Sequence, residues 1–180
     1  FYKKLWGSSL TEMNRDLYSG LKLDRILEVG CNIGMKLNHL QRQGYENLYG
    51  IELQWDAVER AKRRSKHINI IQGSGFDIPF KDDYFDLVYT NGVLIHIHPD
   101  DLPAVMREMV RCSKRYISGL EYFSEKQEEI TYHGKKHALW KNNFPEIFRQ
   151  HCPSLKLRKT RKYHHQGMNG VCDVTYLLEK

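Results

Sequence analysis

The residues of this chain most suited to binding a ligand are two acids and two glycines, Glu28, Gly30, Gly34 and Glu52. A short apolar run ends in the glycines, which let a backbone pass close to a ligand while the N–H groups of a following helix face it. An acid at the tip of the next strand suits a ribose diol, because a carboxylate can accept hydrogen bonds from both hydroxyls. The spacing therefore predicts a nucleoside-binding site.

The glycine turn discriminates between nucleoside ligands. A dinucleotide site uses Gly-x-Gly-x-x-Gly so that the backbone can approach a pyrophosphate. Here Asn32 stands at the middle glycine position and the third glycine is absent. Glu28, two residues before Gly30, would repel a phosphate but could pair with an ammonium. The turn favours a cofactor with an amino-acid tail over NAD.

Further motifs follow in order along the chain. The segment 72–80 contains Gly75, Phe76 and Asp77, and the segment 84–96 is an apolar strand followed by a loop. Together with the glycine turn and Glu52, they resemble the class I S-adenosylmethionine (SAM) dependent methyltransferases over roughly residues 25–120. The resemblance implies SAM as cofactor and S-adenosylhomocysteine as product. It also implies a Rossmann-like, doubly wound α/β sheet, mostly parallel, with a C-terminal antiparallel strand pair.

The same resemblance implies a set of cofactor-binding residues at the glycine turn, after the second strand, in the third motif and at the end of the fourth strand. These are Glu28, Gly30, Cys31, Asn32, Gly34, Glu52, Leu53, Gly75, Phe76, Asp77, Asn91 and Gly92. Asp77 could instead cap a turn before Pro79. Phe76 and Ile78 could sandwich an adenine or pack in the core. Asn32 could turn away from the cofactor or reach its carboxylate.

The catalytic candidates are His96, His98 and Glu121. A methyl group leaving a sulfonium needs a nucleophile in line behind it, and a hydroxyl nucleophile must lose its proton. Histidine can accept that proton near neutral pH. Either histidine could be the base, or one could cap the helix that starts near Asp100. Glu121 follows the fifth strand at the same sheet edge, where it could hold an acceptor hydroxyl, act as base or be an ordinary surface carboxylate.

A closer resemblance concerns the acceptor. The segments 91–100, 111–117 and 175–180, with Glu121 and Tyr122, are similar to methyltransferases associated with pseudaminic acid and related surface sugars. This resemblance implies methylation of a hydroxyl or amine on a small, anionic, sugar-like or nucleotide-linked metabolite in surface-polysaccharide biosynthesis.

A basic run near the end of the chain leaves other functions open. Lys and Arg residues crowd the segment 156–165, and the chain carries a net charge of +6. Such a run could attract a nucleotide-linked sugar, a phosphorylated intermediate or RNA, or it could be a solvated strand face. The alternatives are an RNA methyltransferase and a SAM-binding or scaffold module without catalysis.

Composition sets the outer bounds. With 180 residues and 41% hydrophobic content, the chain suits a single domain spanning 1–180. Its apolar runs fall short of the roughly 18 residues of a membrane helix. The four cysteines are widely spaced, which predicts no metal site or disulfide framework but reduced thiols in a cytoplasmic protein. Because the chain begins at Phe1, we expect a missing N-terminal segment. The oligomeric state stays open.

Hydrophobic periodicity predicts the elements that position these residues. We expect helices over 9–19, 35–43, 55–66, 100–112 and 138–150, and strands over 25–29, 48–52, 68–72, 85–90, 115–120, 155–163 and 171–178. Alternating strands and helices call for a parallel sheet with right-handed crossovers and helices on both faces. Ligands then bind at the carboxyl ends of the strands.

Overall fold

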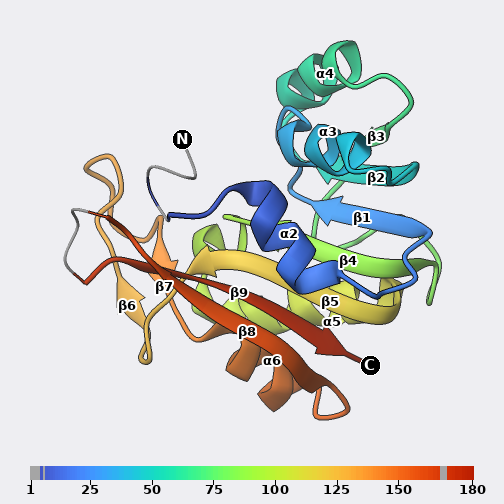
Figure 1. Ribbon diagram of the computed structural model, residues 1–180. Helices are drawn as coiled ribbons and strands as arrows, with labels where there is room; N and C mark the ends of the chain where they lie inside the picture. Colours follow the sequence, from blue (N-terminus) through green and yellow to red (C-terminus); the bar gives the residue numbers. More distant parts are fainter. Residues whose placement is uncertain (1–4, 6, 167–169) are drawn as a thin grey trace.

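The computed structural model describes residues 5, 7–166 and 170–180, which form a seven-stranded sheet and a small hairpin (Figure 1). The main-sheet strands are β1 (Arg25–Val29), β2 (Asn47–Glu52), β3 (Asn69–Gln72), β4 (Phe85–Asn91), β5 (Ser113–Tyr122), β8 (Lys156–His164) and β9 (Cys172–Glu179). Their order is β3-β2-β1-β4-β5-β9-β8. The first five pair in parallel, whereas β9 runs antiparallel to both of its neighbours. The predicted Rossmann-like sheet with an antiparallel C-terminal pair is confirmed. Phe1, where the chain begins, lies outside the described residues.

Helices cover both faces of the sheet. They are α2 (Leu10–Tyr18), α3 (Met35–Arg42), α4 (Trp55–Arg64), α5 (Leu102–Cys112) and α6 (Phe144–His151), with short 3-10 turns η1 (Leu94–His96) and η2 (Pro99–Asp101). Apolar residues of α2, α3 and α4 contribute to one buried core, and those of α5 and α6 contribute to another. Figure 1 shows α2 in front of the sheet and α5 behind it. Within the described part of the chain, no helix has the length and apolar character needed to cross a membrane.

Local signals explain where these helices form. Ser9 and Glu12 make a capping box at the start of α2, in which the Ser9 backbone N–H donates to the Glu12 carboxylate over 2.6 Å. Leu10, Met13 and Leu17 recur at helical spacing and are buried against the sheet. Capping and periodicity thus agree, and helix 9–19 forms nearly as predicted.

The sheet brings the predicted chemistry to one edge. In β1, Leu27 and Val29 face one core while Ile26 and Glu28 point to the opposite face. Because β1, β2, β4 and β5 are parallel, their carboxyl ends, with Glu28, Glu52, Asn91 and Glu121, reach the same edge.

The predicted helix over 138–150 was wrong at its start. The helix begins at Phe144, while Trp140–Lys141 (β7) pairs with Glu128–Glu129 (β6) in the small hairpin. Pro145 occupies the first turn of α6, and a proline lacks the N–H that a position further inside a helix requires. The apolar residues before Asn143 belong to the hairpin and the loop around it.

Candidate active site

The glycine turn after β1 requires glycine for two reasons. Gly30 and Gly34 have φ values of +72° and +73°, in the left-handed region that side chains disfavour. A Cβ atom on Gly30 would also lie 2.6 Å from Val93 Cγ2. Gly30 therefore lets the loop after β4 pack directly against the turn after β1.

Asn32, at the middle position of the motif, also has a positive φ, +47°. Asn tolerates this conformation better than most residues. Its side-chain Oδ1 accepts the N–H of Ile33 over 2.7 Å. The Asn32 side chain therefore stabilises the turn itself, which explains how the motif departs from glycine here.

Glu52, at the tip of β2, is fixed by two backbone donors. Its Oε2 accepts the Asn32 N–H over 2.9 Å, and its Oε1 accepts the Gln54 N–H over 3.0 Å. The carboxylate thus joins the glycine turn to the start of α4. Each oxygen keeps lone-pair capacity for a further donor, such as a ribose hydroxyl.

Glu28 is a buried carboxyl at this edge, with one of its oxygens left over. Only 2% of its surface is exposed, and its Oε2 has no hydrogen-bond partner among the described residues. Burial raises the pKa of Glu28 to about 8, and the nearby Glu52 carboxylate adds to that shift. A buried carboxyl of this kind is ready to pair with an entering cation.

A cavity of about 250 Å³ opens at the glycine turn. Its lining residues are Glu28, Gly30, Cys31, Asn32, Ile33, Met35, Lys36 and Asn91. Predicted cofactor residues from β1, the turn and β4 therefore come together. Met35 and Lys36 were not predicted; their signal was their place directly after Gly34, in the first turn of a helix that opens at the site.

The remaining predicted cofactor residues do not line this cavity: Gly34, Glu52, Leu53, Gly75, Phe76, Asp77 and Gly92. Leu53 and Phe76 are large apolar side chains left 67% and 47% exposed, and Asp77 is also exposed. Ile78 is 1% exposed and packs in the core, which was one of the two alternatives considered for it. A Cβ on Gly75 would lie 3.2 Å from Val29 Cγ1, which keeps this turn close to the sheet.

Arg111 of α5 holds the loop that carries Asp77. Its guanidinium donates to the backbone carbonyls of Ile78 and Phe80, each over 2.8 Å. Glu108 completes the arrangement, since its Oε2 accepts the Ile78 N–H over 2.9 Å. An ion-pair network on α5 therefore positions the third motif from behind.

A second cavity, of about 240 Å³, adjoins the loop after β4. Its lining residues are Leu5, Lys36, Asn91, Gly92, Ile95, His96, Leu120, Glu121, Tyr122 and Asp173. Lys36 and Asn91 line both cavities. These two residues therefore form part of the wall of both spaces.

His96 is the predicted histidine that reaches the second cavity. Its Nδ1 lies 2.7 Å from the carbonyl oxygen of Ala138. A carbonyl only accepts, so Nδ1 carries the proton and Nε2 of the neutral ring keeps a lone pair. His96 thus has the tautomer that a general base needs.

His98 has a different position. Its Nδ1 accepts the backbone N–H of Asp100 over 3.3 Å at the start of η2. Its ring meets Trp140 edge-on, with centroids 5.2 Å apart. His98 is absent from the lining of both cavities and caps the turn before α5, the structural alternative considered for one of the two histidines.

Glu121 reaches the second cavity but is 1% exposed. Its carboxylate accepts the backbone N–H groups of Val93 and Ile95 over 3.2 and 3.4 Å. Burial raises the pKa of Glu121 to about 7, although these hydrogen bonds oppose the shift. Glu121 therefore holds the loop after β4 in place.

Asp173 and His165 form a buried pair that sequence reasoning missed. His165 Nε2 lies 2.8 Å from Asp173 Oδ2, and Asp173 lines the second cavity. Asp173 stands opposite Tyr122 because β9 pairs with β5. Because β5 and β9 are far apart in the sequence, the place of Asp173 beside Tyr122 leaves no local signal.

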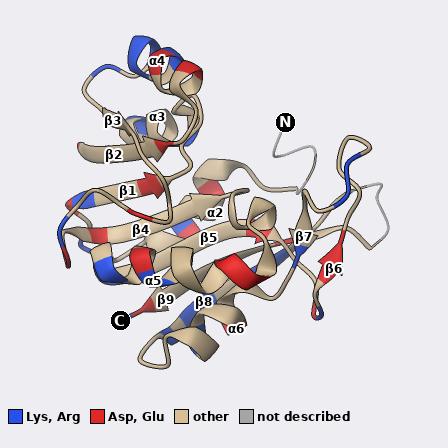
Figure 2. Cartoon of the chain, turned by 180° about the vertical axis from the view of Figure 1, so that it is seen from behind, with Lys and Arg blue, Asp and Glu red and all other residues tan. Residues whose placement is uncertain are grey.

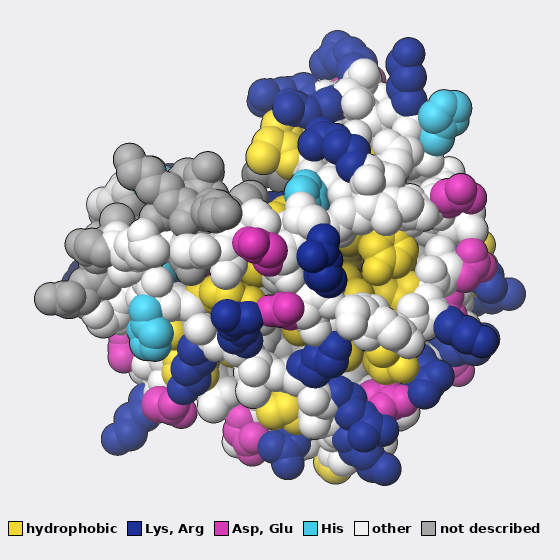
Figure 3. Space-filling view, in the orientation of Figure 1, with side chains coloured by type: hydrophobic (Ala, Val, Ile, Leu, Met, Phe, Trp, Pro, Cys, Tyr) yellow, Lys and Arg dark blue, Asp and Glu magenta, His cyan; other side chains and the backbone are white. Residues whose placement is uncertain are grey.

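The basic run near the C-terminus falls on β8, at the sheet edge, and lines neither cavity. Arg158 pairs with Glu179, and Arg161 pairs with Asp16 over 2.5 Å. Lys162 pairs with Glu125 over 2.7 Å. On the face drawn in Figure 3, acidic and basic side chains are interspersed, and the coloured cartoon of Figure 2 shows both charge types along the chain. Much of the run is thus compensated within the chain.

Comparisons with known proteins agree with this geometry. A family model described as a methyltransferase domain matches residues 27–116. The methyltransferase GfsG of Streptomyces halstedii is 29% identical over 108 residues, covering 55% of this chain and 38% of that protein. The chain spans only 28% to 38% of the length of the curated relatives that it matches.

Solved structures share the fold at low identity. Burkholderia thailandensis 1,6-didemethyltoxoflavin-N1-methyltransferase, with bound 1,6-didemethyltoxoflavin and S-adenosylhomocysteine, has a TM-score of 0.72 at 13% identity, covering 94% of this chain and 76% of that chain. The 4+2 cyclase SpnF has a TM-score of 0.77 at 14% identity, covering 98% and 86%. These likenesses show the fold alone, because proteins with different activities share it.

Proposed function

The chain belongs to the methyltransferase domain family, and from this we propose that it transfers a methyl group from SAM to a hydroxyl or amine of a small acceptor. The observation that carries the proposal is the buried Glu28 carboxyl, whose Oε2 lacks a partner among the described residues, beside the positioned Glu52 carboxylate. One acid suits an ammonium and the other a ribose diol.

The residues of the glycine turn fit this cofactor. Glu28 would hold the ammonium of the amino-acid tail, Glu52 the ribose hydroxyls, and the exposed Leu53 and Phe76 the adenine faces. Gly30 and Gly34 let the turn pack against Val93 and Ser65, which holds its backbone where the ligand would approach. When bound, SAM supplies an electrophilic methyl group on a sulfonium.

His96 is the proposed general base. It would take the proton from an acceptor hydroxyl through Nε2, while its Nδ1–H stays bonded to the Ala138 carbonyl. Asn91 lines both cavities, and Gly92 lines the second. From there the two residues would orient the acceptor for in-line attack. An amine acceptor that is already neutral would need less help from His96.

For the acceptor, we propose a small, anionic, sugar-like or nucleotide-linked metabolite of surface-polysaccharide biosynthesis, methylated in the cytoplasm by a single domain spanning 1–180. The support is the resemblance of the segments around Asn91 and Glu121 to methyltransferases associated with pseudaminic acid. The size of the second cavity, about 240 Å³, suits a metabolite better than a polymer.

RNA is a weaker alternative acceptor. Its motivation was the basic run, and Arg158, Arg161 and Lys162 of that run pair with carboxylates of the chain itself. A steep salt dependence of RNA binding together with methylated RNA would favour it. A SAM-binding module without catalysis is the other alternative, and it predicts cofactor binding with no methylated product.

Calorimetric titration with S-adenosylhomocysteine tests the cofactor site. Glu52→Ala should weaken binding by about tenfold or more, since a charged hydrogen-bond acceptor contributes about 1.5–3 kcal/mol. Glu59→Ala on the outer part of α4 is the matched control, because Glu59 pairs only at the surface with Lys62. Absence of binding by the unmodified chain would contradict the proposal.

A second assay tests the base. Turnover of SAM across carboxylated and neutral sugars, read as S-adenosylhomocysteine formation, should fall about 100-fold in His96→Asn with cofactor affinity unchanged. His98→Asn is the control, because His98 caps η2 outside both cavities. Equal losses in the two variants would argue against His96 as the base.

A further inference from the structure

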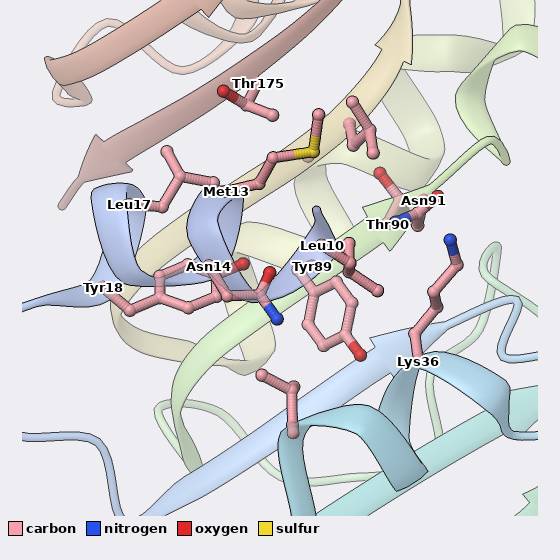
Figure 4. A pocket seen from close by; sticks show the side chains of 13 residues that line it. Leu10, Met13, Asn14, Leu17, Tyr18, Lys36, Tyr89, Thr90, Asn91 and Thr175 are labelled. Carbon is pink, nitrogen blue, oxygen red and sulfur yellow. The ribbon is translucent and has the colours of Figure 1, made fainter. Parts of the chain in front are cut away.

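Lys36 is the cation that the cofactor motifs leave unexplained. It lies in the first turn of α3 and is half-buried. It lines the cavity at the glycine turn and the second cavity, and also a small space of about 20 Å³ between α2 and β4. Figure 4 shows its side chain extending from α3 towards the end of β4, where Asn91 lies. Among the described residues that line the two larger cavities, Lys36 is the sole Lys or Arg.

Lys36 and Glu28 give the cavity at the glycine turn one group of each charge type. Both residues line this cavity of about 250 Å³. The α-amino acid end of the cofactor carries an ammonium and a carboxylate on one carbon. A binding site complementary to it therefore needs one acceptor and one donor of opposite charge on the same cavity wall.

We propose that Lys36 binds the carboxylate of the cofactor's amino-acid tail, so that Lys36 and Glu28 together form a clamp for the zwitterion. This assignment rests on the proposed function, because it presumes that the cavity takes SAM. It adds a selection rule: adenosine ligands that lack the carboxylate should bind more weakly, even when they keep the ammonium.

The environment of Lys36 supports this role. Burial lowers the pKa of Lys36 to about 8. An entering carboxylate would favour the charged form and oppose that effect, as an ammonium would for Glu28. The ligand would thus place a group of opposite charge beside Lys36 and another beside Glu28, and so favour the charged form of both side chains.

The test compares two ligands on three proteins. The ligands are S-adenosylhomocysteine and its decarboxylated analogue 5′-deoxy-5′-(3-aminopropylthio)adenosine, titrated by calorimetry into the unmodified chain, Lys36→Met and Lys36→Arg. Lys36→Met should bind S-adenosylhomocysteine about tenfold more weakly or worse, and its affinity for the analogue should stay unchanged. Lys36→Arg should recover part of the loss, because it restores the cation. Lys22→Met is the surface control, since Lys22 is exposed just before β1, at the opposite sheet edge.

Each other outcome has a definite meaning. Equal losses for both ligands would overturn the assignment, because they would reflect a disturbed cavity. Unchanged binding of S-adenosylhomocysteine by Lys36→Met would also overturn it, and would leave an acceptor carboxylate in the second cavity as the source of the same chemistry. Failure of the unmodified chain to bind S-adenosylhomocysteine would contradict the proposed function itself.

Discussion

The carboxyl ends of β1 and β5 each present a buried glutamate to the site, and the two differ in what surrounds them. Glu28 and Glu121 are 2% and 1% exposed, and burial raises the pKa of both. The two carboxylate oxygens of Glu121 accept hydrogen bonds from the N–H groups of Val93 and Ile95. Glu28 keeps Oε2 without a partner among the described residues, at a cavity wall.

This difference is the reason for proposing that Glu121 is structural and that Glu28 binds the cofactor. A buried carboxyl is costly unless hydrogen bonds satisfy it, so an incompletely satisfied one marks a place where a ligand completes the site. Both oxygens of Glu121 have donors within the protein, whereas Oε2 of Glu28 has none among the described residues. Burial and pKa alone would have ranked the two glutamates together.

The largest expected effect is on stability at Glu121. Glu121→Ala removes the acceptor of the Val93 and Ile95 N–H groups, and leaving both buried donors unsatisfied should cost about 4 kcal/mol of unfolding free energy. Urea denaturation near neutral pH measures it. A loss below about 1 kcal/mol would show that water or loop movement replaces the carboxylate, and the comparison would fail.

Glu28→Gln should affect the ligand instead. We expect S-adenosylhomocysteine to bind about 30-fold more weakly, because an amide cannot offer the charge that an ammonium prefers. The unfolding free energy should fall by no more than about 1 kcal/mol, since Gln keeps the shape of Glu. Calorimetry and urea denaturation of the same preparation give both numbers. A large stability loss with unchanged affinity would place Glu28 with Glu121.

The pH dependence of stability is the third test. The folded-state pKa values, about 8 for Glu28 and about 7 for Glu121, lie above the ordinary value of 4.5. The folded chain therefore holds protons that the unfolded chain releases, so this stability is complete below pH 4.5 and is lost as pH rises through about 8. We expect the unfolding free energy to fall over this window, and Glu28→Gln to flatten the profile. Parallel profiles for the two proteins would contradict the Glu28 assignment.

Much of the cavity at the glycine turn could be predicted from the sequence, because the signals for it are local. Gly30 and Gly34 mark a strand-to-helix turn through backbone conformation, and Glu52 ends a short apolar run. These features depend on neighbours within a few residues. The strand β1 accordingly runs from Arg25 to Val29 as predicted.

The second cavity depends on contacts between segments that are distant in the sequence. Glu121 could not be read as a loop anchor without knowing that Val93 folds back onto it. Asp173 enters the second cavity only because β9 lies beside β5. The β6–β7 hairpin pairs Glu129 with Trp140 in strands too short to give a periodic pattern. Lys36 was missed because helical spacing alone does not tell which face meets a cavity.

The smallest expected effect concerns Asn32, and it tests whether the turn beside Glu28 is held by local chemistry alone. Asn32 has a φ of +47°, and its Oδ1 accepts a hydrogen bond from the Ile33 N–H. Asn32→Ala loses both the tolerance and the bond, so the unfolding free energy should fall by about 1–2 kcal/mol, while Asn32→Gly should lose only a few tenths because glycine accepts the conformation. Thermal denaturation measures both variants. Equal losses would show that the side-chain bond, rather than the backbone conformation, stabilises the turn, and Glu52, which accepts the Asn32 N–H, would then depend on that bond as well.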